Sequence, residues 1–380
     1  MQGQDCPTAQ AIFEELWKIA PQLPQFEQNL ADALVCERKF ASAEKHFANL
    51  ANKGFAGPLL KDPYFETFVR LHHSAKVETA AAEQARVIGI ASEAFEVPDD
   101  RTMPESMAFD AAESRFIIGS TYLRKLIEYR VGRGFSDFGD SSSGNLLQAL
   151  GVKLDESKRL LYVCTAADTL EMRNAEKRDL GRSGLFIYDL RSGRLQRSLW
   201  MHDGRAHLFN DVALGTNGEA YITDSTDGSL FKLTNTLRLK RITARRAFIY
   251  PNGIAFNTAR NLLYVADVRG LYTVDLQNQH ITPIRTSGAI STAAIDGLYA
   301  FGNELVAVQA GVNPMRIVAF HLSPDGKEIL SARILLENDG RLTDPTGGTI
   351  ANGRFYFIAN SHATHARAGN RHSSVLSVAL

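Results

Sequence analysis

The sequence predicts a mainly β protein, a six-bladed β-propeller preceded by a small α-helical N-terminal domain. Three observations support this fold class. Residues 1–85 are rich in helix-forming residues and poor in β-branched ones. Across residues 86–380, short runs rich in Val, Ile, Tyr and Phe are separated by turn residues, as is typical of strands. These runs recur in six similar units, and repeats of about 40–50 residues with several strands each are the signature of a propeller.

The helical segment contains two predicted antiparallel helices on either side of residues 38–42. Their apolar residues step by three and four, which is the period of one helix face. The pair resembles one tetratricopeptide repeat, because four residues fall at that family's offsets: Leu30, Leu34, Ala43 and Phe47. Glu27 stands where that family has tryptophan. The resemblance implies that residues 7–85 could bind a protein partner, and an unrelated helical hairpin is the alternative interpretation.

Two of the three cysteines, Cys6 and Cys36, fall in this segment. They could pair in an oxidising compartment. The interpretation that the sequence favours is that Cys36 is a buried helix residue and Cys6 a free thiol, as is usual for intracellular proteins. The first residues, as written, have no basic start and no apolar core, so no signal peptide is expected; a chain that begins after a removed signal would look the same.

The six repeat units define the blades. Each unit opens with a strand whose second residue serves as a marker, and successive markers are 45, 60, 42, 44 and 50 residues apart. A closed ring needs its two ends tied together, and residues 86–90 and 373–380 are expected to contribute strands to one shared blade. The six markers are Glu105, Leu150, Asn210, Asn252, Asp296 and Thr346.

Equivalent positions in the innermost strands of a propeller converge on the central channel. Four of the markers carry side-chain oxygen atoms: Glu105, Asn210, Asn252 and Asp296. Buried carboxylates repel each other unless a cation neutralises them. Two carboxylates and two amides suit Ca²⁺, with Mg²⁺ or Mn²⁺ as substitutes, rather than zinc. Each residue alone could be an ordinary turn residue, but their shared position in four of six repeats favours a cation site.

Several segments resemble motifs of the regucalcin/gluconolactonase (senescence marker protein) family. They are Pro104-Glu105, Phe209-Asn210-Asp211, residues 250–254 and Ile295-Asp296-Gly297. The resemblance implies a six-bladed propeller with one divalent cation, usually Ca²⁺, and hydrolysis of lactones or related esters. It assigns Glu105, Asn252 and Asp296 to the cation ligands, and it assigns Asn210 to the asparagine that binds metal or substrate.

The sequence departs from the family pattern at three positions. Ser106 stands where many members have glycine and the paraoxonases have aspartate, so a second calcium site of the paraoxonase kind is not expected. Leu208 replaces the arginine of the sugar lactonases, which weakens an aldonolactone as the substrate. Leu150 and its neighbours provide no histidine for a paraoxonase-like dyad.

The expected mechanism is polarisation of the substrate carbonyl by the cation. Asp296 is the candidate general base or nucleophile, and Asn210 is its candidate catalytic partner. His207 and His362 are candidate substrate-binding residues or nearby bases, although a lone histidine is more often structural.

Other functions stay open at this point. The main alternative is a non-catalytic binding module built from the propeller and the helices, because fold does not fix function. A lyase or isomerase using the same site is a third option. The balance of 42 Lys+Arg and 42 Asp+Glu argues against a nucleic-acid partner, and no apolar run is long enough for a membrane span. Because related bacterial proteins are often exported, a periplasmic or secreted location is favoured over a cytoplasmic one.

Overall fold

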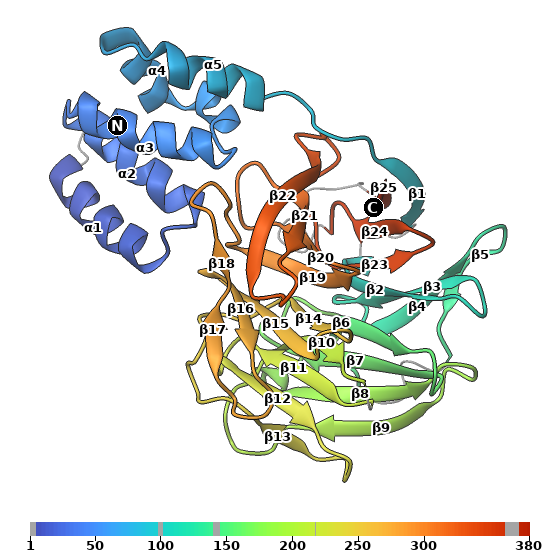
Figure 1. Ribbon diagram of the computed structural model, residues 1–380. Helices are drawn as coiled ribbons and strands as arrows, with labels where there is room; N and C mark the ends of the chain where they lie inside the picture. The colour runs from blue at the N-terminus through green and yellow to red at the C-terminus, as the bar shows by residue number, and fades with distance from the viewer. Residues whose placement is uncertain (1–4, 98–101, 140–144, 217, 362–371) are drawn as a thin grey trace.

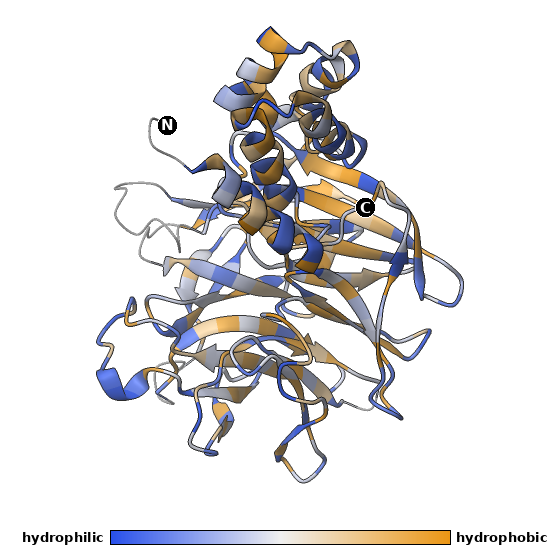
Figure 2. Ribbon diagram, turned by 90° about the vertical axis from the view of Figure 1, so that its left-hand side faces the viewer, coloured by the Kyte–Doolittle hydropathy of each residue, from blue (hydrophilic) through white to orange (hydrophobic). Residues whose placement is uncertain are grey.

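The computed structural model describes residues 5–97, 102–139, 145–216, 218–361 and 372–380. Six β-sheets surround a central channel, and five helices precede them along the chain (Figure 1). The predicted fold class is therefore confirmed. Hydrophobic residues concentrate in the strands, whereas the loops between them are largely hydrophilic (Figure 2).

Blades 1 to 3 are four-stranded antiparallel sheets in which strand order follows chain order, so each blade is a local meander. Blade 1 contains β2 (Pro104–Asp110), β3 (Arg115–Ser120), β4 (Lys125–Arg130) and β5 (Gly134–Asp137). Blade 2 contains β6 (Gln148–Asp155), β7 (Leu160–Ala166), β8 (Ser183–Asp189) and β9 (Leu195–Trp200). Blade 3 contains β10 (Phe209–Leu214), β11 (Ala220–Asp224), β12 (Ser229–Leu233) and β13 (Leu239–Arg241).

Blades 4 and 5 continue the pattern, and blade 5 has an additional short strand, β18, that pairs in parallel with β22. Blade 4 contains β14 (Ile254–Asn257), β15 (Leu262–Asp267), β16 (Gly270–Val274) and β17 (Ile281–Pro283). Blade 5 contains β18 (Arg285–Thr286), β19 (Ile295–Phe301), β20 (Glu304–Gln309), β21 (Arg316–Leu322) and β22 (Glu328–Glu337).

Blade 6 closes the ring by combining strands from both ends of the propeller. Its order is β23 (Gly348–Ala351), β24 (Arg354–Ile358), β25 (Ser373–Ala379) and β1 (Ser92–Val97), with β1 outermost. The expected C-terminal contribution is present. The prediction of a strand at residues 86–90 is wrong. The pairing found within this range is an isolated bridge between Ile88 and Glu337 of blade 5. The closing strand begins at Ser92, whose alternating pattern places Phe95 and Val97 in the core.

The N-terminal region forms five α-helices and two of them start at strong caps. Asp5 accepts a hydrogen bond from the Thr8 N–H at 3.2 Å, and Asp62 accepts one from the Tyr64 N–H at 2.7 Å, each just before a proline in the first turn. None of the described helices is long and apolar enough to cross a membrane. The helices are α1 (Cys6–Ile19), α2 (Pro24–Cys36), α3 (Phe40–Asn52), α4 (Pro63–Leu71) and α5 (Ala75–Gln84).

Helices α2 and α3 are the two helices predicted around the break at residues 38–42. Their facing residues are buried in one apolar cluster with α4 and α5, including Leu30, Leu34, Ala43 and Phe47. Glu27, at the family's tryptophan position, is fully buried and lies between Asn49 at 2.5 Å and Lys53 at 3.1 Å. The tetratricopeptide-like assignment stays a prediction.

Cys6 and Cys36 form a disulfide that ties the start of α1 to the end of α2, with their Cα atoms 6.0 Å apart. The favoured expectation of free thiols is therefore wrong for this pair. The antiparallel packing of α1 on α2 brings the two ends together, which spacing along the chain could not show. Cys164 is a free, buried cysteine in blade 2.

Candidate functional site

The innermost strands are irregular at the marker residues. Register shifts interrupt the pairing of β2, β6, β10 and β19 with their neighbours, and each shift falls at or beside the marker of its blade. A bulge turns a side chain out of the regular alternation and is common next to active sites. The repeated bulge explains how Glu105, Asn210 and Asp296 can face the channel from strands that are otherwise buried.

The residue after each marker is usually glycine because neighbouring blades meet there. A Cβ atom on Gly151 would lie 2.7 Å from the Asn210 carbonyl oxygen, and one on Gly253 would lie 2.7 Å from the Asp296 carbonyl oxygen. Gly347 has the same relation to Glu105, at 2.8 Å. The absence of side chains therefore lets adjacent inner strands approach closely around the channel.

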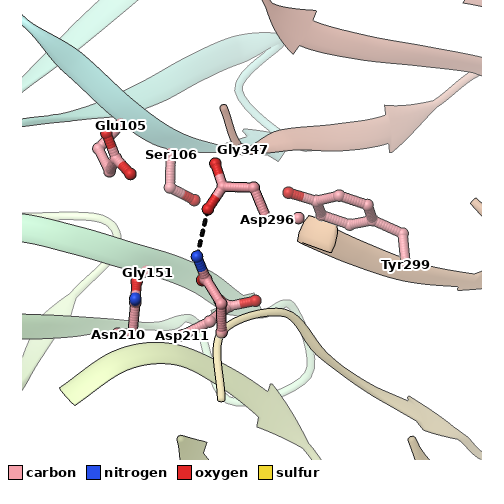
Figure 3. A pocket seen from close by; sticks show the side chains of 10 residues that line it. Glu105, Ser106, Gly151, Asn210, Asp211, Asp296, Tyr299 and Gly347 are labelled. Carbon is pink, nitrogen blue, oxygen red and sulfur yellow. Dashed lines mark hydrogen bonds between the residues drawn. The ribbon is translucent and has the colours of Figure 1, made fainter. Parts of the chain in front are cut away.

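The structure brings the four predicted cation ligands to one place. Glu105, Asn210, Asn252 and Asp296 all line a small cavity at the channel, and all four also line the larger cavity of about 310 Å³ above it. Figure 3 shows Glu105, Asn210 and Asp296 around the small cavity, each from a different blade. Of the other two markers, Leu150 lines only the larger cavity and Thr346 lines neither.

The two amides are held by hydrogen bonds. The Asn252 side-chain N–H donates to the Asp296 carboxylate, the dashed line of Figure 3. The Asn210 side-chain N–H donates to the Ser225 hydroxyl at 3.0 Å, which leaves the Asn210 amide oxygen as an acceptor. Ser225 itself donates to the Pro251 carbonyl oxygen at 2.6 Å, so blades 3 and 4 are linked behind the site.

The two carboxylates of the site are half-buried, and neither has a cationic partner among the described residues. Burial raises the pKa of Glu105 well above its usual range, and the negative charges of Asp296, Asp344 and Asp168 raise it further. Burial likewise raises the pKa of Asp296 to about 7, although the hydrogen bond from Asn252 works in the opposite direction. These shifts mean that the site disfavours two negative charges unless a cation or protons compensate them.

Several buried carboxylates of the blades have cationic partners. Asp110 is fully buried and lies 3.1 Å from the Arg115 guanidinium and 2.7 Å from that of Arg159. Burial by itself raises the pKa of Asp110, but these contacts lower it below its usual value. Within the described residues, no Lys or Arg forms an ion pair with Glu105 or Asp296. The contrast distinguishes the carboxylates at the channel from structural ones.

The donor set fits a hard divalent cation. Two carboxylates and two amide groups are oxygen ligands of the kind that Ca²⁺ takes, and four of them leave positions for water or a substrate oxygen. No cluster of three or more His, Cys, Asp or Glu side chains suited to a metal occurs among the described residues. The set at the channel contains only two such side chains, because its other two members are amides.

His207 does not line either cavity. It is buried in blade 3, where its Nδ1 lies 2.5 Å from Asp224 and its Nε2 lies 2.8 Å from Asp203. Burial would lower the pKa of His207, but the hydrogen bonds to the two carboxylates raise it. This placement gives His207 a structural role and does not support the predicted substrate contact. His362 lies outside the described residues.

Three residues close to the small cavity were not assigned to the site from the sequence: Asp211, Lys153 and Tyr299. Asp211 lines the small cavity; burial raises its pKa, whereas the charge of Lys153 lowers it. The Lys153 ammonium lies 4.4 Å from the centre of the Tyr299 ring, and the Tyr299 hydroxyl accepts the Gly348 N–H at 2.6 Å. A signal did exist for Asp211, because it is the one charged residue at a position that is otherwise glycine or serine.

Three further residues surround the larger cavity. Asp168 and Glu171 come from the β7–β8 connection, and Tyr250 precedes the blade 4 marker. The long interval between the second and third markers indicated an insertion here, but not that its acidic residues reach the channel. No described Lys or Arg lines this cavity. Without a bound cation, its acidic side chains therefore give the mouth of the cavity a negative charge.

Comparison with known proteins gives one family and a common fold. Residues 104–329, more than half of the chain, match the family model for the SMP-30/Gluconolactonase/LRE-like region. No curated protein matches the chain significantly.

Solved structures with low sequence identity share the propeller. A gluconolactonase from Xanthomonas campestris is 15% identical, with 79% of this chain and 93% of that chain covered and a TM-score of 0.53. A luciferin-regenerating enzyme is 14% identical, with 77% and 95% covered and a TM-score of 0.52. The PQQ-bound aldose sugar dehydrogenase from Streptomyces coelicolor is 12% identical, with 77% and 99% covered and a TM-score of 0.51. At these identities the likeness concerns the fold alone.

Proposed function

The chain belongs to the SMP-30/Gluconolactonase/LRE-like family, and on this premise we propose that it is a divalent-cation-dependent hydrolase of lactones or related esters. The observation that carries the proposal is the pair of desolvated, uncompensated carboxylates, Glu105 and Asp296, that share one cavity with two amides. A propeller that served only as a scaffold would have no need of such a costly arrangement.

Four side chains would hold the cation: Glu105, Asn210, Asn252 and Asp296. We propose Ca²⁺ as the resident ion, with Mg²⁺ or Mn²⁺ as substitutes, because every donor is oxygen. When bound, the ion would supply Lewis-acid polarisation of the substrate carbonyl. The chain's own contribution is the placement of the donors: bulges position Glu105, Asn210 and Asp296, and a hydrogen bond to Asp296 holds Asn252.

Asp296 and Asn210 are the proposed catalytic residues. The Asp296 carboxylate can take the proton of the attacking water or attack the carbonyl carbon itself, and Asn252 orients it by hydrogen bonding. Asn210 is held by Ser225, so its amide oxygen stays available to the ion or to a substrate hydroxyl. Both residues line the larger cavity in which a substrate would lie.

The larger cavity restricts the class of substrate. Its volume of about 310 Å³ suits a small ring, and its described lining combines Asp168, Glu171 and Tyr250 with no Lys or Arg. Leu208 lines it where the sugar lactonases carry arginine. We therefore expect neutral or positively charged lactones and esters to be better substrates than those with a carboxylate.

Calorimetric titration of metal-free protein with Ca²⁺ tests the proposal. We expect one site in the wild type and no detectable binding in Asp296→Ala. Asp137→Ala is the matched control, because Asp137 is an exposed aspartate on β5 that pairs with Lys125; it should bind Ca²⁺ as the wild type does. A screen of γ-lactones carrying a hydroxyl, ammonium or carboxylate group should then show Ca²⁺-dependent hydrolysis.

The outcomes separate the candidate functions. Absence of Ca²⁺ binding by the wild type would contradict the hydrolase and favour the non-catalytic binding module. Binding without turnover of any lactone or ester would instead point to a lyase, an isomerase or a binding protein that uses the same ion.

We also propose a periplasmic or secreted location. The disulfide between Cys6 and Cys36 supports it, because such bonds persist in oxidising compartments. Alkylation of free thiols in intact cells before lysis should leave these two cysteines unlabelled. Labelling of both would argue for a reducing compartment.

A further inference from the structure

The helical domain contacts the chain just before the proposed ligand Asp296. Gln22, in the α1–α2 connection, accepts hydrogen bonds at its side-chain oxygen from the Thr292 N–H at 2.9 Å and the Thr292 hydroxyl at 2.8 Å. The Gln22 carbonyl oxygen accepts a third, from the Ser291 hydroxyl at 2.7 Å. Residues 291–294 connect β18 to β19, and Asp296 is the second residue of β19.

The same segment is held from the other side by a buried polar chain. Gln309 is fully buried, and its side-chain N–H groups donate to the Ser291 carbonyl at 3.2 Å and the Ala293 carbonyl at 2.9 Å. Its side-chain oxygen accepts from Arg316 at 2.7 Å. The Arg316 guanidinium in turn lies 4.1 Å from the centre of the Phe55 ring, which belongs to the helical domain. The helical domain therefore contacts both ends of this series of polar groups, through Gln22 at residues 291–292 and through Phe55 at Arg316.

Apolar contacts fill the space between these polar groups. Ala293 is fully buried in a cluster with Ala20 and Leu23 of the helical domain. Val312, from the β20–β21 turn, is part of the core of the helices themselves. The helices thus lie against blade 5 as a packed layer next to β18 and β22 (Figure 1), and the docking surface reaches the strand that carries Asp296.

We propose that the helical domain positions the cation ligand Asp296, with Gln22 as the principal positioning residue. This inference rests on the proposed function, because it assigns the domain a role at that same site. Asp296 is desolvated and is repelled by Asp211 and Asp344, so its backbone must resist displacement. The left-handed conformation of Ala294, with φ of 53°, adds to the need for external support. Gln22 supplies it through two hydrogen bonds to one residue of the connection.

The expected effect is a weaker cation site in a folded protein. Removal of groups that support metal ligands lowers metal affinity by about 10–100-fold. Gln22 acts through four intervening residues, so we expect Gln22→Ala to weaken Ca²⁺ binding by about tenfold, at the low end of that range. Gln22→Glu keeps the accepting oxygen and should restore an affinity close to that of the wild type.

The experiment is calorimetric Ca²⁺ titration of the full chain, with thermal unfolding to confirm the fold. Asn338→Gly is the matched control, because the Asn338 side chain donates to the carbonyl oxygens of Gln84 and Arg86 at 2.9 Å and so links the helical domain to blade 5 outside the 291–296 segment. Its φ of 57° suits glycine, and it should bind Ca²⁺ like the wild type. Thr292→Val is a second test should Gln22→Ala lower the unfolding temperature, because it removes one of the two bonds while keeping the glutamine, although the Leu271 N–H also loses its acceptor.

The results distinguish this inference from the proposed function. Loss of affinity in Gln22→Ala, with recovery in Gln22→Glu and none of the loss in Asn338→Gly, supports the positioning role. Equal Ca²⁺ affinity in the wild type, Gln22→Ala and Thr292→Val would overturn it while leaving the cation site intact. Failure of the wild type to bind Ca²⁺ would overturn both.

Discussion

At the scale of single residues, this protein withdraws carboxylates from water in two ways. Asp227 lies between the Arg241 and Arg245 guanidinium groups, at 2.9 and 2.5 Å, and is part of the blade structure. Glu105 and Asp296 have no such partners in the described chain and share a cavity with each other. A charge withdrawn from water without a partner is strongly unfavourable, so this pair needs a bound cation or protons to compensate it.

Another carboxyl, the half-buried Asp32 on α2, gives a prediction on pH. Burial raises the pKa of Asp32 to about 8, and the nearby charge of Asp62 adds to the shift. Between about pH 4 and pH 8 the folded protein keeps a proton that the unfolded chain releases, so this group makes the protein less stable as pH rises through that window. Asp32→Asn should therefore match the wild type near pH 4 and be more stable at pH 8.

Urea unfolding followed by circular dichroism at both pH values measures this difference. Glu83→Gln makes the same change of charge at an exposed position of α5 and should not alter the pH dependence. An Asp32→Asn protein whose stability falls with pH as steeply as that of the wild type would show that Asp32 is not the group responsible.

At the scale of elements, the inner strands do most to build the site. Four of them, β2, β6, β10 and β19, are bulged at or beside their markers. Gly151, Gly253 and Gly347 lie against the backbone of the next blade, so the position of one ligand depends on the backbone of its neighbour. A single methyl group added at one of these glycines should therefore displace the backbone that carries a ligand.

Gly253→Ala tests this dependence. Its new Cβ atom would lie 2.7 Å from the Asp296 carbonyl oxygen, so one of the two strands must move. We expect a loss of about 1–3 kcal/mol in unfolding free energy, typical of overpacking, together with weaker Ca²⁺ binding. Denaturant unfolding and calorimetry measure the two effects. Gly340→Ala, where a Cβ atom would meet nothing within 4 Å, should be neutral in both; unchanged Ca²⁺ affinity in Gly253→Ala would mean that the inner strands tolerate displacement.

At the scale of the whole molecule, ring closure depends on β1. Phe95 of this strand stacks on Tyr129 of blade 1, with ring centres 4.0 Å apart, while its backbone pairs with β25 of blade 6. One strand thus joins the first blade to the last. Without it, the apolar cluster that the two blades share would lose Phe95 and Val97, and blade 6 would lose a ladder of hydrogen bonds.

Phe95→Ala should accordingly destabilise the propeller by about 3–5 kcal/mol, as is usual for truncation of a buried phenylalanine. Chemical unfolding monitored by tryptophan fluorescence measures the change. Leu330→Ala, at a position of β22 that is 52% exposed, is the control and should stay within about 0.5 kcal/mol of the wild type. A neutral Phe95→Ala would show that the ring is closed by other contacts.

The sequence alone determined the repeat, the number of blades and the marker positions. These properties follow from local patterns, since each blade is a meander of neighbouring strands and repeats at a regular interval. It also predicted that Glu105, Asn210, Asn252 and Asp296 would meet, because equivalent positions of a repeat occupy equivalent places around one axis. Their role as ligands stays a prediction.

Only the tertiary structure decided which residues join that ring and what supports it. Asp211 and Asp168 reach the channel through a bulge and a loop insertion, the closing strand is Ser92–Val97, and Cys6 meets Cys36 because two helices pack antiparallel. Gln22 and Thr292 are 270 residues apart in the sequence, yet the Thr292 backbone nitrogen lies 2.9 Å from the Gln22 side-chain oxygen. Such contacts arise from the packing of separately formed elements, and no periodicity or spacing along the chain encodes them.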